Sequence, residues 1–260
     1  MTGVVAATPA WPALTAAGVV IGVLFGLFGV GGSSFATPVL GLLGVQGLVA
    51  VAAPLPAAIP AAIVGAASYA RRGQVDRDVA RWSILGGAPA TVVGALLSPW
   101  VGGRLLLIAS GIVLAIVGLR ILARIPESKR LAGRARRRAG VVVPAAAGIG
   151  LFTGLLANGG GFLLVPLFVV VLGLTMPESA GTSLVVIAVL AVPTLVTHWA
   201  LGHIDWAVAG PFAAGAVPAA PVGAWMAPRV GGDRLKTAFG VLLVAFAVYF
   251  VAHQLRAGRA

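Results

Sequence analysis

The sequence contains no cysteine, and only 9% of its 260 residues are charged. Without cysteine the chain can form no disulfide, no thiolate metal site and no cysteine nucleophile. A soluble domain of this length carries about 25% charged residues. Because 60% of the residues here are hydrophobic, most of the surface is expected to face a lipid bilayer. Three histidines and six acidic residues leave little material for a metal cluster, so we predict neither a metal nor another cofactor.

Basic residues outnumber acidic ones by 18 to 6, which gives a net charge of +12. They gather in two short hydrophilic stretches between long apolar runs, which is typical of cytoplasmic loops under the positive-inside rule. This distribution favours membrane topology over a nucleic-acid partner, and we predict no nucleic acid. The two clusters are Arg71, Arg72, Arg77 and Arg81, and Arg124, Lys129, Arg130, Arg134, Arg136, Arg137 and Arg138.

Long apolar runs dominate the chain, and a hydrocarbon core of about 30 Å needs about 20 apolar residues per helix. The first ten residues hold no Lys or Arg, so we interpret the first run as a membrane helix rather than a signal peptide. Two of the runs, 34–43 and 162–172, are too short to span comfortably. The predicted segments are 11–28, 34–43, 48–70, 79–101, 105–123, 141–157, 162–172, 179–201, 206–230 and 235–255.

The two short runs lie at corresponding places in an internal repeat. Residues 26–33 align with residues 154–161 at an offset of 128, and Pro38 then falls on Pro166. After that point the offset is 129 over most of the half. Glycine, proline and aspartate positions recur at this spacing: Gly44 and Gly173, Gly73 and Gly202, Asp76 and Asp205, Gly86 and Gly215, Pro89 and Pro218, Gly94 and Gly223, Pro99 and Pro228.

The basic residues change sides between the two halves. Loop 71–81 has four arginines, whereas the matching loop 202–205 has none; loop 102–104 has one basic residue, and its counterpart 229–236 has three. Each half therefore crosses the membrane an odd number of times, as inverted repeats do. Arg256 and Arg259 in the tail run against this rule.

We therefore predict an all-α, polytopic helical membrane protein with two inverted-topology repeats and paired discontinuous short helices. The repeats are residues 1–124 and 140–260, joined by a basic loop, 125–139. In a bacterial cytoplasmic (inner) membrane the N-terminus would lie outside and the central loop 124–138 would be cytoplasmic.

A glycine cluster precedes each short run and predicts a break in the helix. Glycine lets the backbone unwind, and the N–H groups at the start of the next helix then lack partners. Such groups persist in a membrane only where protein, water or ligand satisfies them. The N–H groups and the positive end of the helix dipole together form an anion site without a charged side chain. Paired breaks in two halves are the usual sign of a transport site.

Helix packing and nucleotide binding account less well for the glycine clusters. Small residues allow close packing of membrane helices, but this does not account for a break, a short helix and a proline recurring together. A nucleotide-binding loop would need Lys-Ser or Lys-Thr after the glycines and a strand before them, and the sequence has neither.

The same residues carry a resemblance to a known family. The paired motifs at 29–33 and 157–161, together with Pro38, Pro166 and the segment 180–184, resemble the TauE/SafE family of membrane permeases, over nearly the whole chain. The resemblance implies a small sulfur-containing or organic anion, moved outward. The substrate-binding residues that we predict are Gly31, Gly32, Ser33, Ser34, Asn158, Gly159, Gly160, Gly161, Thr182 and Ser183.

The two half-sites are chemically unequal. The hydroxyl pair Thr182-Ser183 corresponds to Ala53-Pro54 in the first half, and Ser33-Ser34 corresponds to Gly161-Phe162 in the second. Thr182 and Ser183 could donate to an anion or bond to carbonyls of their own helix. Asn158 could bind substrate or cap the restarting helix.

The titratable residues narrow the function further. Every Asp and Glu lies outside the predicted spans, which argues against a cation transporter. His198 suits either an interfacial position or proton coupling. No nucleophile–base pair or acid pair supports an enzyme. We predict a secondary transporter of a small anion, sulfite or an organosulfonate, with a passive anion channel or a membrane assembly factor as alternatives. The sequence leaves open whether the chain forms a homo-oligomer.

Overall fold

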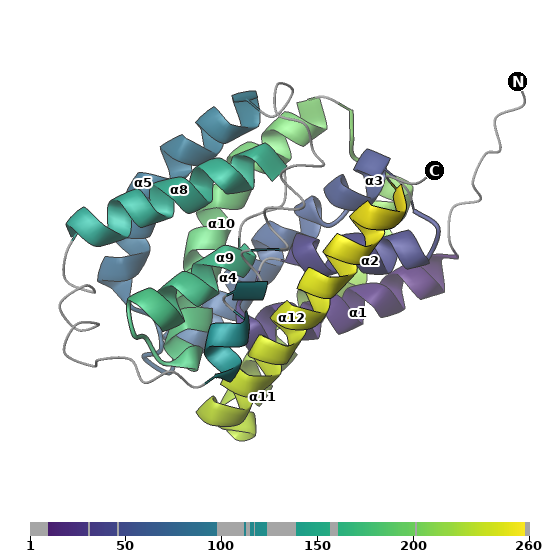
Figure 1. The fold of residues 1–260 in the computed structure, drawn as a ribbon. Helices are drawn as coiled ribbons and strands as arrows, with labels where there is room; N and C mark the ends of the chain where they lie inside the picture. Colours follow the sequence, from purple (N-terminus) through teal and green to yellow (C-terminus); the bar gives the residue numbers. More distant parts are fainter. Residues whose placement is uncertain are drawn as a thin grey trace, which may run out of the picture.

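The computed structural model describes residues 10–257, apart from residues 31, 46, 98–111, 113, 114, 117, 124–138, 157–160 and 201. Every regular element among the described residues is a helix (Figure 1). The first half contains α1 (Trp11–Phe28), α2 (Gly32–Leu42), α3 (Gly47–Ala52), α4 (Leu55–Ala70) and α5 (Arg77–Leu97). The second contains α8 (Ala139–Leu156), α9 (Gly161–Pro166), the π-helix η2 (Leu167–Val171), α10 (Met176–Ala200), α11 (Trp206–Val230) and α12 (Gly232–Ala257).

The predicted spans agree well with the helices, with two differences. The runs 11–28 and 206–230 coincide with α1 and α11. The run 48–70, however, is two helices, α3 and α4, with a turn between them. Pro54 has no N–H to continue the hydrogen bonding of α3, while a proline in the first turn of the next helix costs nothing. About half of the predicted run 105–123 lies outside the described residues.

The second short run is also interrupted. The run predicted at 162–172 begins as α9 and continues as η2 from the residue after Pro166. Because Pro166 has no N–H, the carbonyl four residues before it loses its helical donor. The wider π turn follows at this point, and the N–H of Leu172 donates to the carbonyl of Leu167 at 3.2 Å.

The helices have the length and the surface of membrane-spanning segments. Among the described residues, α1, α10 and α11 are long and apolar enough to cross a membrane, and α4 and α8 are shorter apolar helices. Their outward faces carry large apolar side chains that a water-soluble protein would bury, such as Val20, Ile63 and Val196. The chain is therefore an all-α polytopic membrane protein.

The internal repeat is visible in the positions of the helices. Adding 128 to the bounds of α1 gives the bounds of α8, and adding 129 to those of α2 covers α9 and η2. The starts of α3 and α5, moved by 129, fall on the starts of α10 and α11. Two differences remain among these elements. The turn after Ala52 separates α3 from α4 where α10 is continuous, and α2 is a single α-helix where its counterpart changes from α9 to η2.

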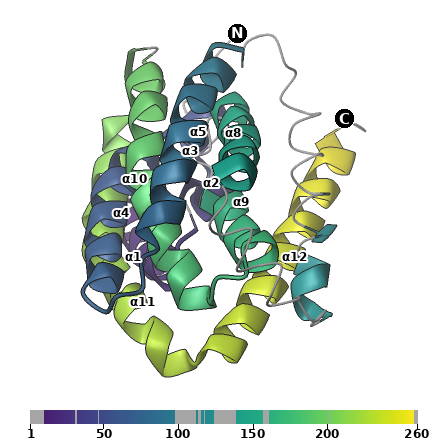
Figure 2. The same ribbon diagram turned by 90° about the vertical axis from the view of Figure 1, so that its left-hand side faces the viewer.

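Two helix pairs dominate the packing, α1 with α11 and α5 with α8. The two pairs are equivalent in the repeat, because α8 corresponds to α1 and α11 corresponds to α5. Figures 1 and 2 both show α5 and α8 side by side. In each pair, glycines let the two backbones touch, as small residues do in membrane proteins. The contacts are equivalent: Gly215 on Thr15 and Gly86 on Val143, Gly22 on Ala216 and Gly150 on Gly87, Gly223 on Val23 and Gly94 on Leu151.

The contacts also fix the relative directions of the helices. Residue numbers rise together in α1 and α11 and in α5 and α8, so the helices of each pair are parallel. By the same test, α4 is parallel to α11, α10 is parallel to α5, and α4 is antiparallel to α10. For α4 and α11 the contacts are Arg72–Ala224 and the crevice shared by Ala57, Ala61, Phe212 and Ala216. For α5 and α10 they are Gly87–Leu190 and Asp76–Thr182, and for α4 and α10 they are Gly65–Leu184 and Tyr69–Gly181.

Corresponding helices of the two halves therefore run in opposite directions. α1, α4 and α11 point one way, and their counterparts α8, α10 and α5 point the other way. This is the arrangement expected of inverted repeats. Beyond α11 the chain reverses at Gly231, which has a φ of 81°, and Figure 2 shows α11 and α12 meeting there in a V.

The equivalence of the two helix pairs predicts equal effects of matched substitutions. Gly94→Ala and Gly223→Ala each place a methyl group against the backbone of the partner helix. Both are expected to destabilise the protein by about 1–3 kcal/mol, the usual cost of overpacking, measured as thermal unfolding in detergent. Gly210→Ala is the control, because nothing lies within 4 Å of the added methyl. A large effect at only one of the two matched positions would contradict the equivalence.

Candidate functional site

The first predicted break is present between α1 and α2. α1 ends at Phe28, and Gly29 follows in the left-handed region with a φ of 68°, its N–H donating to the carbonyl of Phe25 at 2.8 Å. A side chain is disfavoured at Gly29 for two reasons. The left-handed backbone conformation is costly for any residue with a Cβ, and a methyl group there would overlap the backbone of Ala180 in α10. α2 then begins at Gly32. The glycine thus ends one helix and brings the break against the other half of the protein.

Two hydroxyl groups satisfy the carbonyls that α1 leaves exposed at this break. The last carbonyls of a helix have no partner within it. The hydroxyl of Tyr69 lies 2.9 Å from the carbonyl oxygen of Gly26 and 3.1 Å from that of Leu27. The hydroxyl of Ser183 lies 2.6 Å from the carbonyl oxygen of Gly29. One cap comes from each half, because Tyr69 belongs to α4 and Ser183 to α10.

The hydroxyl pair on α10 is fully buried and already bonded within the protein. Besides its bond to Gly29, Ser183 lies 2.9 Å from the carbonyl of Ala180 in its own helix. Thr182 accepts a hydrogen bond of 2.9 Å from the backbone N–H of Asp76, in the loop before α5. Both hydroxyls therefore hold the first half of the chain against α10, and Ser183 reaches the break that the sequence predicted.

The structure describes only some of the remaining predicted residues. Gly32, Ser33 and Ser34 form the first turn of α2, and Gly161 is the first residue of α9. Gly31, Asn158, Gly159 and Gly160 lie outside the described residues. Their assignment to substrate binding stays a prediction.

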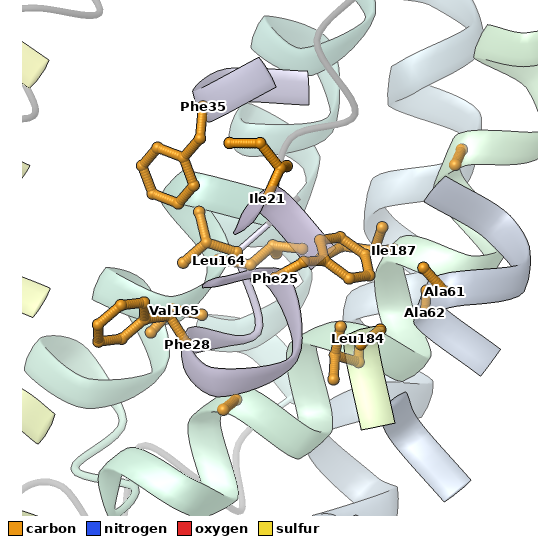
Figure 3. Packing of buried hydrophobic residues seen from close by; sticks show 14 of the residues in the cluster. Ile21, Phe25, Phe28, Phe35, Ala61, Ala62, Leu164, Val165, Leu184 and Ile187 are labelled. Atoms are coloured by element: carbon orange, nitrogen blue, oxygen red, sulfur yellow. The ribbon is translucent and has the colours of Figure 1, made fainter. Parts of the chain in front are cut away.

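Apolar side chains from both short helices gather near the end of α1. Figure 3 shows Leu164 and Val165 of α9 gathered with Phe25 and Phe28 of α1 and with Phe35 of α2. All of these side chains are buried in the apolar core. Phe28 also contacts Phe239 of α12, with ring centroids 5.5 Å apart. The end of α1, where the first break begins, is thus surrounded by apolar side chains from both halves.

A small crevice between α1, α4 and α11 is apolar. It is lined by apolar side chains and one glycine: Ile21, Gly22, Phe25, Pro54, Ala57, Ala58, Ala61, Phe212 and Ala216. Nothing in this lining would bind an anion.

The second half carries a histidine pair where the first half has Tyr69. His198 corresponds to Tyr69 and His203 to Gln74, at the offset of 129. The Nδ1 atoms of the two histidines lie 3.3 Å apart, and His198 is buried. Which nitrogen donates depends on the tautomers of the two rings, and an imidazole takes the place that the Tyr69 hydroxyl has in the first half.

Sequence reasoning missed Tyr69, whose single hydroxyl proton is shared between two of the exposed carbonyls. A signal was available: a tyrosine inside an apolar membrane helix must find a partner for its hydroxyl. The partner itself lies 43 residues earlier in the sequence, and only the fold brings the two together.

The fold defines the class of the protein, a polytopic helical membrane protein. The model of the sulfite exporter TauE/SafE family matches residues 14–250. The chain belongs to this family. No solved structure matches the chain.

Curated relatives cover nearly the whole chain. A probable membrane transporter protein of Xylella fastidiosa (strain 9a5c) is 27% identical over 246 residues, which are 90% of this chain and 92% of the relative. The probable membrane transporter protein YjnA of Bacillus subtilis is 24% identical over 232 residues, 84% and 91% of the two chains. YunE of the same organism, with the same description, is 23% identical over 269 residues, 93% and 96%. The chain is accordingly a multi-pass membrane transporter.

Proposed function

We propose that the protein carries a small anion, sulfite or an organosulfonate or related organic anion, out of a bacterial cell across the cytoplasmic membrane. The observation that supports it best is the break between α1 and α2. There Gly29 ends one helix, α2 begins three residues later, and hydroxyls from both halves satisfy the exposed carbonyls. The description of the family as sulfite exporters supports the substrate class.

The anionic group would bind to backbone N–H groups at the starts of the two short helices. These are the N–H groups near Gly31, Gly32 and Ser33 in the first half and near Gly159, Gly160 and Gly161 in the second. A helix terminus contributes up to about 2 kcal/mol to a partly buried anion. Two termini with nearby hydroxyls give an affinity of around millimolar to micromolar, which lets a carrier release its substrate.

Alternating access would follow from rocking of the two halves about these breaks. The contacts between the halves at Ser183 and Thr182 would have to open and close in each cycle. The distribution of basic residues favours an N-terminus outside and a loop 124–138 in the cytoplasm. A passive anion channel would use the same break without rocking.

Uptake by proteoliposomes tests the substrate and the mechanism together. The purified protein is screened with sulfite, sulfate, thiosulfate, sulfoacetate and simple carboxylates, with and without a pH gradient. We expect saturable uptake of sulfite or a sulfonate above that of protein-free liposomes. Uptake that does not saturate and far exceeds carrier rates would favour the channel. No uptake of any anion would overturn the proposal.

A matched pair of glycine variants tests the second break. Gly160→Leu is expected to abolish uptake while the protein remains folded in the membrane, because a bulky side chain there would obstruct access to the proposed amide site. Gly148→Leu is the control, since an added methyl at Gly148 in α8 has open space around it. Normal uptake by Gly160→Leu would count heavily against the amide site.

A further inference from the structure

Arg72 joins the two halves of the protein through a carbonyl that a proline leaves unpaired. One terminal nitrogen of its guanidinium lies 2.7 Å from the carbonyl oxygen of Ala224 in α11. Pro228, four residues later in the same helix, has no N–H. The carbonyl of Ala224 therefore has no helical donor and is available to Arg72.

This contact lies next to the first break. Gly26, near the end of α1, packs directly on the backbone of Ala220 and Ala224. The carbonyl of the same glycine accepts the hydroxyl of Tyr69, which precedes Arg72 by three residues. Ala224 thus contacts Arg72 through its carbonyl and faces the end of α1 through its backbone nitrogen.

Arg72 differs in its contacts from Arg81 and Arg229. The guanidinium carbon of Arg81 lies 6.0 Å from the ring centroid of its neighbour Trp82, and that of Arg229 lies 3.3 Å from the ring centroid of Trp225 in its own helix. Arg72 alone of these three reaches across to the other half of the repeat. Its counterpart at the offset of 129 is Leu201, so the charge is present on one side only.

We propose that Arg72 is the side chain that recognises the anion at the first break, exchanging the Ala224 carbonyl for the anionic group of the substrate. The inference rests on the proposed anion transport. A guanidinium has five N–H donors in a fixed plane and binds oxyanions with two of them at once. An oxyanion is therefore a stronger partner than one carbonyl oxygen.

The exchange would connect substrate binding to movement. The bond from Arg72 to Ala224 holds the loop after α4 against α11, and so holds the first half against the second. When the guanidinium turns to an anion, this bond is released. Binding at the break thereby removes one of the contacts that keep the halves together, as alternating access requires.

A purely structural role would have Arg72 do no more than cap the carbonyl of Ala224. Pro228→Ala separates the two roles, because an alanine N–H at position 228 can satisfy that carbonyl within α11. In the double variant Arg72→Gln/Pro228→Ala the carbonyl is capped and the charge is lost. If Arg72 only caps the carbonyl, this double variant should bind and take up the anion like the wild type. If Arg72 binds the anion, both binding and uptake should be weakened.

The experiment measures uptake by proteoliposomes against the concentration of sulfite and of sulfoacetate, and the binding of both to the purified protein by calorimetry. For Arg72→Gln we expect at least about a tenfold rise in half-saturating concentration and in dissociation constant, as for loss of a charged hydrogen bond. Arg72→Gln/Pro228→Ala is expected to show the same rise, and Pro228→Ala none. Arg71→Ala, which removes the neighbouring charge, is expected to stay within about twofold of the wild type.

Three results would overturn the role of Arg72: unchanged constants in Arg72→Gln, recovery in the double variant, or an equal rise in Arg71→Ala. The last would mean that the loop acts by its total charge. Failure of the wild-type protein to take up any anion would instead overturn the proposed function. The two failures are thus distinguishable.

Discussion

Gly29→Ala is expected to destabilise the protein strongly and to abolish anion uptake. An alanine at a φ of 68° costs about 1–2 kcal/mol. Its methyl group would also overlap the backbone of Ala180, which adds about 1–3 kcal/mol of overpacking. Relief of this overlap would push α10 away from the break and would separate the hydroxyl of Ser183 from the carbonyl it caps. Thermal unfolding in detergent and uptake by proteoliposomes measure the two effects.

Gly73→Ala is a closely matched control for this prediction. Gly73 has a φ of 69°, almost the same as Gly29, but nothing lies within 4 Å of an added methyl. The control therefore carries the backbone strain without the overlap, and we expect it to unfold at a slightly lower temperature and to transport normally. Equal losses of stability in the two variants would mean that the contact between Gly29 and Ala180 is unimportant.

Ser183→Ala is expected to weaken the protein by about 1–2 kcal/mol, the upper range for hydrogen bonds between membrane helices. The substitution leaves the carbonyl of Gly29 without the donor from Ser183, and an unsatisfied buried group costs more than an average hydrogen bond contributes. We also expect slower uptake, because the bond joins α10 to the break at which the substrate is proposed to bind. The free energy of unfolding and the initial rate of uptake are the two measurements.

Ser179→Ala provides the comparison on the same helix. Ser179 lies four residues before Ser183 and is equally buried, but its hydroxyl has no hydrogen-bond partner among the described residues. Its removal is expected to be neutral or slightly stabilising, since an unpaired hydroxyl is costly to bury. If both serine variants behave alike, the cap on Gly29 contributes nothing measurable.

Several features of the fold could be predicted because they depend on local chemistry. Hydropathy alone located α1 and α11 to the residue. The glycine cluster at 29–33 predicted a break because glycine is needed at a positive φ and a short helix follows. The split of the run 48–70 was not predicted, although Pro54 indicates it. The residues stay apolar through the turn, and hydropathy does not depend on whether a residue has a backbone N–H.

The contacts at the break could not be predicted in this way. Ser183 was chosen for its possible bond to substrate, and the structure directs its hydroxyl to Gly29, 154 residues away. The partner of Tyr69 could not be predicted, since a single polar group in an apolar helix has many conceivable partners. The positive-inside rule explained Arg72 as one of four loop charges without indicating its bond to Ala224.

The sequence alone determined that the protein lies in a membrane, that it is duplicated and where helices end. These features depend on the length of the apolar runs and on glycines and prolines that act on the backbone of their own segment. The tertiary structure decided which groups satisfy the backbone at those ends. Exposed carbonyls accept any nearby donor, and in a membrane the donor must come from another helix, so packing of α4, α10 and α11 around α1 made the choice.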